Sequence, residues 1–273
     1  MTPNGAFSRQ PGDGWQQRTL PALAQLAAQD ARISDFRVHG STSGAGAAID
    51  RWSDLDVLIT AAEPSTAAED LAREIGRCLS PVYAADRGGD PSAYAVRLVL
   101  SDLRRIDITA TAPAGGEQSP AAAAQNQSPP DRVAELIGTF QFEAVLAAVK
   151  AARHDVLIGA HLTLQLARHI LVIAMLLRDR DAGTAHHRYG GSRWDAWASH
   201  LAQAPAPYTQ AAITAAIRFY ATKLDEIVAD WDPHLQLDNR PLLELLDSVD
   251  QQSTPVATAP SAPTPGTHMS GPR

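Results

Sequence analysis

Short runs of alternating apolar and polar residues dominate the first part of the chain, and this period of two is typical of β-strands with one buried face. It predicts strands over 33–39, 53–59, 93–100 and 105–110. Between them, apolar residues recur at helical spacing over 20–30 and 67–79. The pattern therefore predicts strands and helices mixed in one small sheet domain.

Helical periodicity alone runs through the second part of the chain, with few clusters of β-branched residues. It predicts an all-helical domain whose helices span 131–152, 155–180, 194–202, 207–231 and 241–249. The most apolar run, 170–177, is bounded by Arg168 and Arg178 and is too short to span a bilayer. We expect this run to form a buried helix, and we expect no membrane association.

Two segments are rich in Ala, Pro, Ser, Thr and Gln and hold too few bulky apolar side chains to fold. They predict a flexible connector over 113–130 and a disordered tail over 251–273. The connector separates a sheet domain over 18–112 from a helical domain over 131–250. The expected fold class is α+β, with a small mixed-sheet domain followed by an all-helical C-terminal domain.

The composition narrows the range of partners. The chain has 273 residues and a formal net charge of -7, which gives no support to a broad basic surface for long nucleic acid. A cationic small molecule suits such a protein better. The single cysteine, Cys78, excludes an internal disulfide framework, and residues 1–17 lack the apolar core of a signal peptide. We therefore expect a cytoplasmic protein.

A set of small and acidic residues in the sheet domain indicates chemistry. Gly40 and Ser41 follow one predicted strand, and Asp54 and Asp56 stand one residue apart on the next, so their carboxylates share one face. Asp107 lies between apolar neighbours on a later strand and provides a third carboxylate. Oxygen ligands of this kind select Mg²⁺, which also binds substrate phosphates. The pattern predicts phosphoryl or nucleotidyl transfer.

Each part of this set also has a purely structural interpretation. Gly40 and Ser41 are common turn formers, and Asp54 and Asp56 would be ordinary residues on a solvated strand edge. However, their strand continues as an apolar run through Ile59, and acids at its start are costly unless a cation meets them. We therefore favour the functional interpretation of the whole set.

The same residues carry a resemblance to a known family. Gly40-Ser41, a spacer, Asp54 and Asp56 on one strand and Asp107 on another resemble the nucleotidyltransferase superfamily of the DNA polymerase beta type, across the predicted sheet domain. The resemblance implies that the Gly-Ser turn binds the triphosphate of a nucleotide. It also implies that the first two acids bind two Mg²⁺ ions and that the third completes one metal site.

The order of the two domains is similar to that of the antibiotic-modifying members of this superfamily, especially the aminoglycoside and streptomycin adenylyltransferases. In the helical domain the resemblance depends on the run 150–155, on the long apolar helix after it and on the run 186–191. It implies transfer of AMP from ATP, the co-substrate, to a hydroxyl of a small, aminoglycoside-like acceptor. It also implies that the acceptor lies between the two domains.

The resemblance further implies a carboxylate that acts as general base for the acceptor hydroxyl, at a position that varies among family members. Asp155 is the first candidate, because it starts an apolar helix beside the basic Arg153 and His154, and Glu143 is the second. The alternative for Asp155 is an N-cap, a position at which Asp is strongly preferred. A base must also lie within hydrogen-bond reach of the hydroxyl that it activates.

Two other functions stay open on the sequence alone. A protein-modifying nucleotidyltransferase of the toxin and antitoxin type would use the same fold on a side-chain hydroxyl of a partner. A non-catalytic nucleotide-binding module would keep the fold without the chemistry. Such a module would be expected to lose at least one of Asp54, Asp56 and Asp107, because like charges repel one another without their ions. The intact set favours an enzyme.

Overall fold

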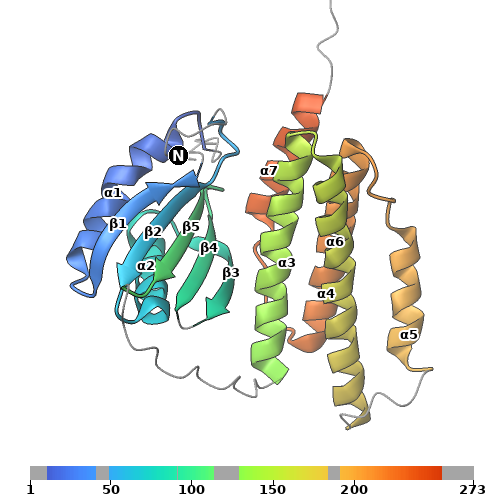
Figure 1. The fold of residues 1–273 in the computed structure, drawn as a ribbon. Helices are drawn as coiled ribbons and strands as arrows, with labels where there is room; N and C mark the ends of the chain where they lie inside the picture. Colours follow the sequence, from blue (N-terminus) through green and yellow to red (C-terminus); the bar gives the residue numbers. More distant parts are fainter. Residues whose placement is uncertain (1–10, 41–48, 91, 114–128, 184–190, 254–273) are drawn as a thin grey trace, which may run out of the picture.

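The computed structural model describes residues 11–40, 49–90, 92–113, 129–183 and 191–253. A five-stranded sheet carries two helices on one side and a bundle of mostly longer helices on the other (Figure 1). We call residues 11–113 the sheet half and residues 129–253 the helical half. This architecture confirms the predicted α+β class.

The sheet contains β1 (Ile33–His39), β2 (Leu55–Ala61), β3 (Val82–Asp90), β4 (Ala93–Leu100) and β5 (Arg105–Thr111). Their order across the sheet is β1-β2-β5-β4-β3, with β2 and β5 parallel and every other pair antiparallel. The sequence pattern predicted four of these strands but not β3. The alanines, glycines and charged residues of β3 show no apolar alternation, so this strand depends on its pairing with β4.

One face of the sheet packs against α1 (Trp15–Gln29) and α2 (Pro64–Cys78). On β2, Leu55, Val57 and Ile59 point into this core and are fully buried, whereas the residues between them are half-buried. Because side chains alternate along a strand, Asp56 lies on the opposite face. That face also carries Val99 of β4, which belongs to the core of the helical half. The acidic side of the sheet therefore turns toward the helices.

The helical half contains α3 (Pro129–Ala152), α4 (Val156–Ala182), α5 (Arg193–Ala198), a 3₁₀ helix (Ser199–Gln203), α6 (Gln210–Trp231) and α7 (Arg240–Ser253). α3 packs against α4, α6 and α7 and also against β3 (Figure 1). Large side chains such as Phe140 are fully buried there, and each contributes roughly 1.5–3 kcal/mol. Trp52 and Leu103 of the sheet half join the same core, so the two halves share a hydrophobic interface.

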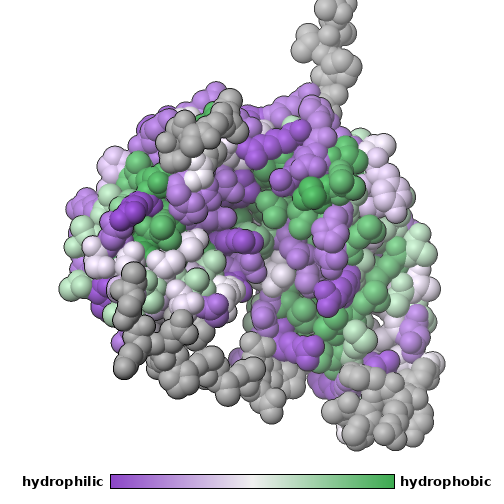
Figure 2. All heavy atoms as spheres, viewed as in Figure 1, coloured by the Kyte–Doolittle hydropathy of each residue, from purple (hydrophilic) through white to green (hydrophobic). Residues whose placement is uncertain are grey.

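Among the described helices, α4 is long and apolar enough to cross a membrane. A core helix passes the same test, and α4 buries Leu166, Ile170 and Ile173 completely. Its other side leaves Leu157 and Leu171 exposed, and Figure 2 shows more apolar surface over the helical half than over the sheet half. The helix that we expected to be buried is thus buried along one side only.

Most of the connector expected over 113–130 and most of the tail expected over 251–273 lie outside the described residues. At their margins, α3 already begins at Pro129 and α7 ends at Ser253. His186, which contributed to the family resemblance, also lies outside the described residues. The domain limits of 18–112 and 131–250 stay predictions.

Candidate metal and nucleotide site

The carboxylates of Asp54, Asp56 and Asp107 come together beside the parallel pair β2 and β5. One oxygen atom from each lies within 4.8 Å of the others. Asp56 and Asp107 are register partners across the two strands, and Asp54 lies just before β2 begins. We call these three residues the acid cluster. The structure brings together the three acids that the sequence singled out, and all their ligand atoms are of the type that Mg²⁺ prefers.

Burial and the repulsion of a neighbouring carboxylate disfavour the charged forms of Asp56 and Asp107. Burial, and then the charge of Asp54, raise the pKa of Asp107 to about 7. The same two causes, in the same order, raise the pKa of Asp56. The nearby guanidinium groups of Arg105 and Arg97 oppose both shifts. A divalent cation among the three carboxylates would remove the repulsion, so the electrostatics fit a metal site.

Arg105 supplies a buried positive charge beside the acid cluster. Its side chain is 9% exposed, and its guanidinium lies 3.7 Å from the carboxylate of Asp54. The guanidinium also donates a hydrogen bond to the carbonyl of Trp52. Arg105 was not among the predicted site residues, although it stands two positions before Asp107 on β5, a spacing that puts both on one face of a strand. Arg105 orients Asp54 and offsets part of the negative charge.

Five titratable side chains form a row across the sheet at the level of the acid cluster. The strand register pairs His39 with Asp56, Asp56 with Asp107, Asp107 with Arg97, and Arg97 with Asp86. The Arg97 guanidinium lies 3.8 Å from the Asp107 carboxylate and 3.6 Å from that of Asp86, and its side chain is 52% exposed. Arg97 is therefore an accessible cation at the margin of the cluster. The sequence pattern did not single out Arg97, because its approach to Asp107 depends on the pairing of β4 with β5, which residue spacing does not reveal.

Gly40 directly follows β1 and lies against the acid cluster. Its φ of 68° is in the left-handed region, which favours glycine. A Cβ built on Gly40 would lie 2.9 Å from Cγ of Asp56 and closer still to Oδ2 of the same carboxylate. A side chain is excluded here by both backbone conformation and space. Ser41 lies outside the described residues, so phosphate binding by this turn stays a prediction.

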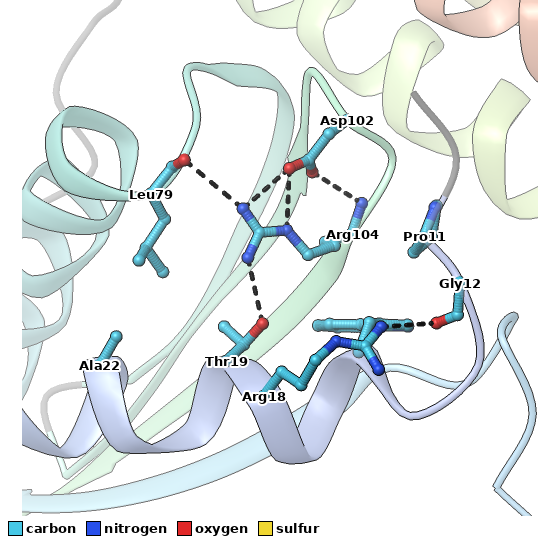
Figure 3. A pocket seen from close by; sticks show the side chains of 9 residues that line it. Pro11, Gly12, Arg18, Thr19, Ala22, Leu79, Asp102 and Arg104 are labelled. Carbon is cyan, nitrogen blue, oxygen red and sulfur yellow. Dashed lines mark hydrogen bonds and ion pairs between the residues drawn. The ribbon is translucent and has the colours of Figure 1, made fainter. Parts of the chain in front are cut away.

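A pocket of about 290 Å³ opens between α1 and the turn that joins β4 to β5 (Figure 3). Arg104 forms part of its wall and donates hydrogen bonds to the carboxylate of Asp102 at 2.9 Å and to the hydroxyl of Thr19 at 3.0 Å. A longer hydrogen bond of 3.5 Å reaches the carbonyl of Leu79. All three nitrogen atoms of the Arg104 guanidinium thus bind groups within the protein. The effect of these hydrogen bonds is to fasten α1 to the segment that leads into Arg105.

The two candidate bases lie on the hairpin formed by α3 and α4. Asp155 is the N-cap of α4: its carboxylate accepts a hydrogen bond from the backbone N–H of Ile158 at 3.3 Å, and Nζ of Lys150 lies 3.4 Å away. Glu143 of α3 lies 2.8 Å from Nε2 of His169 on α4. The N-cap alternative for Asp155 is thus observed, and a catalytic role for either carboxylate stays a prediction.

No family model and no curated protein match the sequence. Among solved structures, an aminoglycoside 6-adenyltransferase from Bacillus subtilis is similar with a TM-score of 0.29 and 9% identity, over 86% of this chain and 98% of that one. The Bradyrhizobium diazoefficiens CD-NTase CdnG in complex with GTP has a TM-score of 0.27 and 15% identity, over 89% and 96%. The STING-associated CdnE c-di-GMP synthase from Capnocytophaga granulosa has 0.25 and 13%, over 89% and 83%. TM-scores this low carry no argument about the function of this chain.

Proposed function

We propose that the protein is a magnesium-dependent nucleotidyltransferase that transfers AMP from ATP to a hydroxyl of a small acceptor. The observation that carries this proposal is the acid cluster, in which three carboxylate oxygens lie within 4.8 Å of one another. Such an all-oxygen, triply acidic set suits Mg²⁺ bound together with substrate phosphates. Gly40 supports the same conclusion, because it leaves bare backbone beside these carboxylates.

Each residue of the site has a separate task in this proposal. Asp54, Asp56 and Asp107 would hold two Mg²⁺ ions, which when bound supply electrostatic stabilisation to the attacking and leaving oxygens. The turn at Gly40 and Ser41 binds the triphosphate through backbone N–H groups and the serine hydroxyl. In the transfer, the acceptor oxygen forms a bond to the α-phosphorus while the bond from that phosphorus to pyrophosphate breaks.

The proton of the acceptor hydroxyl needs a base, and Asp155 is our first candidate. Its side chain is 36% exposed. A carboxylate has about four acceptor positions, so the hydrogen bond from Ile158 leaves capacity for a substrate hydroxyl. Glu143 is the second candidate, because its carboxylate is already engaged by His169. The base accepts the proton as the oxygen–phosphorus bond forms.

The acceptor that we propose is a hydroxyl-bearing, cationic, aminoglycoside-like molecule. The formal net charge of -7 favours cationic partners over polyanions. The face of the sheet that carries the acid cluster turns toward the helical half, which is where an acceptor would meet both halves. If the acceptor is an antibiotic, its adenylylation in the cytoplasm would make a cell that contains this protein resistant to it.

The direct test is incubation of the purified protein with Mg²⁺, a panel of aminoglycosides that includes streptomycin, and each of the four ribonucleoside triphosphates labelled at the α-phosphate. The proposal expects one acceptor to gain the mass of one AMP, with Asp54→Asn and EDTA as negative controls. Label found on a protein instead would favour the protein-modifying alternative. Nucleotide binding without transfer to any acceptor would favour the binding module, and absence of both would refute the site.

A further inference from the structure

Residues 50–53, which lead into Asp54, are held in place by α1 of the sheet half. The side-chain amide of Gln16 donates hydrogen bonds to the carbonyls of Asp50 and Ser53, each at 3.0 Å. Gln16 is itself completely buried. From β5, Arg105 donates a hydrogen bond to the carbonyl of Trp52 in the same segment. The backbone immediately before the first acid of the cluster is therefore fixed from two elements of its own half.

A third contact with this segment comes from the helical half, through Arg153, which directly follows α3. Its Nη2 lies 2.5 Å from Oδ1 of Asp50 and its Nε lies 3.1 Å from Oδ2, so the guanidinium meets the carboxylate as a fork. Nη2 also donates to the hydroxyl oxygen of Ser53 at 3.0 Å. That hydroxyl in turn donates to Oδ1 of Asp50 at 2.9 Å. Arg153, Asp50 and Ser53 form a closed triangle of hydrogen bonds beside Asp54.

The turn that presents Arg153 is itself well determined. His154 adopts a left-handed conformation with φ 59°, which reverses the chain between α3 and α4. On its far side Asp155 caps α4, and its carboxylate also lies 3.4 Å from Nζ of Lys150. The guanidinium of Arg153 is thus carried by a turn with its own stabilising contacts. A shift of the helical half would therefore move Arg153 and, through its hydrogen bonds, Asp50 and Ser53 before Asp54.

We propose that Arg153 is a positioning residue that couples the helical half to the acid cluster. It acts through its hydrogen bonds to Asp50 and Ser53 on the placement of Asp54. The inference rests on the proposed function in one respect, namely that the cluster binds divalent metal. Outer-shell partners of metal ligands typically change metal affinity or activity by 10–100-fold, so the effect should be measurable.

The test is the affinity of the full-length protein for Mn²⁺, measured from the electron paramagnetic resonance signal of free Mn²⁺ and supported by calorimetry with Mg²⁺. Arg153→Met should weaken binding by about 10-fold or more, whereas Arg153→Lys should restore part of it. Asp50→Asn, which can still accept hydrogen bonds, should weaken binding similarly. Arg153→Met combined with Asp50→Asn should be no worse than either change alone, because both break the same link.

Arg218→Met is the matched control. Arg218 has the same 32% side-chain exposure as Arg153 and pairs with Asp247 and Asp250 of α7, an interaction within the helical half. This control should leave Mn²⁺ affinity unchanged even if it lowers thermal stability. If Arg218→Met lost as much Mn²⁺ affinity as Arg153→Met, the effect of Arg153→Met would reflect a general loss of stability. That result would overturn the inference.

Two further outcomes separate this inference from the proposed function. Wild-type affinity in both Arg153→Met and Asp50→Asn would overturn the coupling while leaving the metal site intact. A wild-type protein that binds neither Mn²⁺ nor Mg²⁺ would overturn the metal site and the coupling together. Should Arg153→Met fail to fold, Asp50→Asn alone decides between these outcomes.

Discussion

The backbone of Gly40 packs against the carboxylate of Asp56, so that a Cβ on Gly40 would lie 2.9 Å from Cγ of Asp56. Gly40 directly follows β1, and His39 at the end of β1 is the register partner of Asp56 on β2. The proposed phosphate-binding turn at Gly40 is therefore in direct contact with the proposed metal ligand Asp56. A substitution at the turn must displace the ligand.

Gly40→Ala should lower transfer about 100-fold or more, because the methyl group displaces a group that supplies electrostatic stabilisation. The measurement is initial rate at saturating Mg²⁺ and nucleotide. Gly183→Ala is the matched control, since Gly183 has a similar φ of 62° but open space around its Cβ. The Gly183→Ala variant should lose only the roughly 1–2 kcal/mol of stability that backbone strain costs, and it should keep full activity. Equal activity losses in both variants would mean that strain alone is responsible.

Asp54→Asn and Asp56→Asn should each abolish transfer, with losses of about 100-fold or more. In EDTA Asp56→Asn should be no less stable to thermal unfolding than the wild type, because it relieves like-charge repulsion. Asp35→Asn is the control: Asp35 pairs with Arg37 on β1, away from the acid cluster, and its loss should leave turnover unchanged. Turnover above a tenth of wild type in either cluster variant would refute the metal assignment.

The raised pKa of Asp107 should make the metal-free protein less stable as pH rises. Burial and the charge of Asp54 move this pKa from 3.8 to about 7, so the folded protein keeps a proton that the unfolded chain releases. The free energy of unfolding should therefore fall between about pH 4 and pH 7. Urea unfolding in EDTA across this range checks the prediction.

The comparison with Asp107→Asn isolates this group from the other acids. The variant should show a shallower fall over the same pH range, and saturating Mg²⁺ should flatten the curve of the wild type, because metal binds the deprotonated carboxylate. Identical pH dependence in wild type and variant would show that the Asp107 carboxyl is not the source of the effect.

Asp155→Asn tests the base without removing the helix cap, because Asn is as good an N-cap as Asp. If Asp155 is the base, kcat should fall by about 10²–10⁴ while nucleotide affinity and thermal stability stay unchanged. Asp155→Ala should in addition lose about 1 kcal/mol of stability with the cap. A fully active Asp155→Asn protein would leave Asp155 as an N-cap only and move the search to Glu143→Gln.

Local sequence pattern was sufficient to predict four of the five strands, the helices and the acids of the cluster. β1, β4 and β5 begin where their alternating residues begin, and the spacing of Asp54 and Asp56 already placed both carboxylates on one face, since the period of a strand is a property of its own backbone. The helices followed in the same way from their apolar spacing. By contrast β3 has no such signal, and its position comes from pairing with β4.

The sequence by itself determined the α+β class and the composition of the acid cluster, because both depend on residue types at short spacing. Only the tertiary structure decided which positively charged side chains lie beside the cluster. Arg97 reaches Asp107 through strand register, and Arg153 reaches Asp50 across 103 positions of the chain through the packing of the two halves. Long-range pairing of this kind depends on the whole packed interface and leaves no periodic trace along the chain.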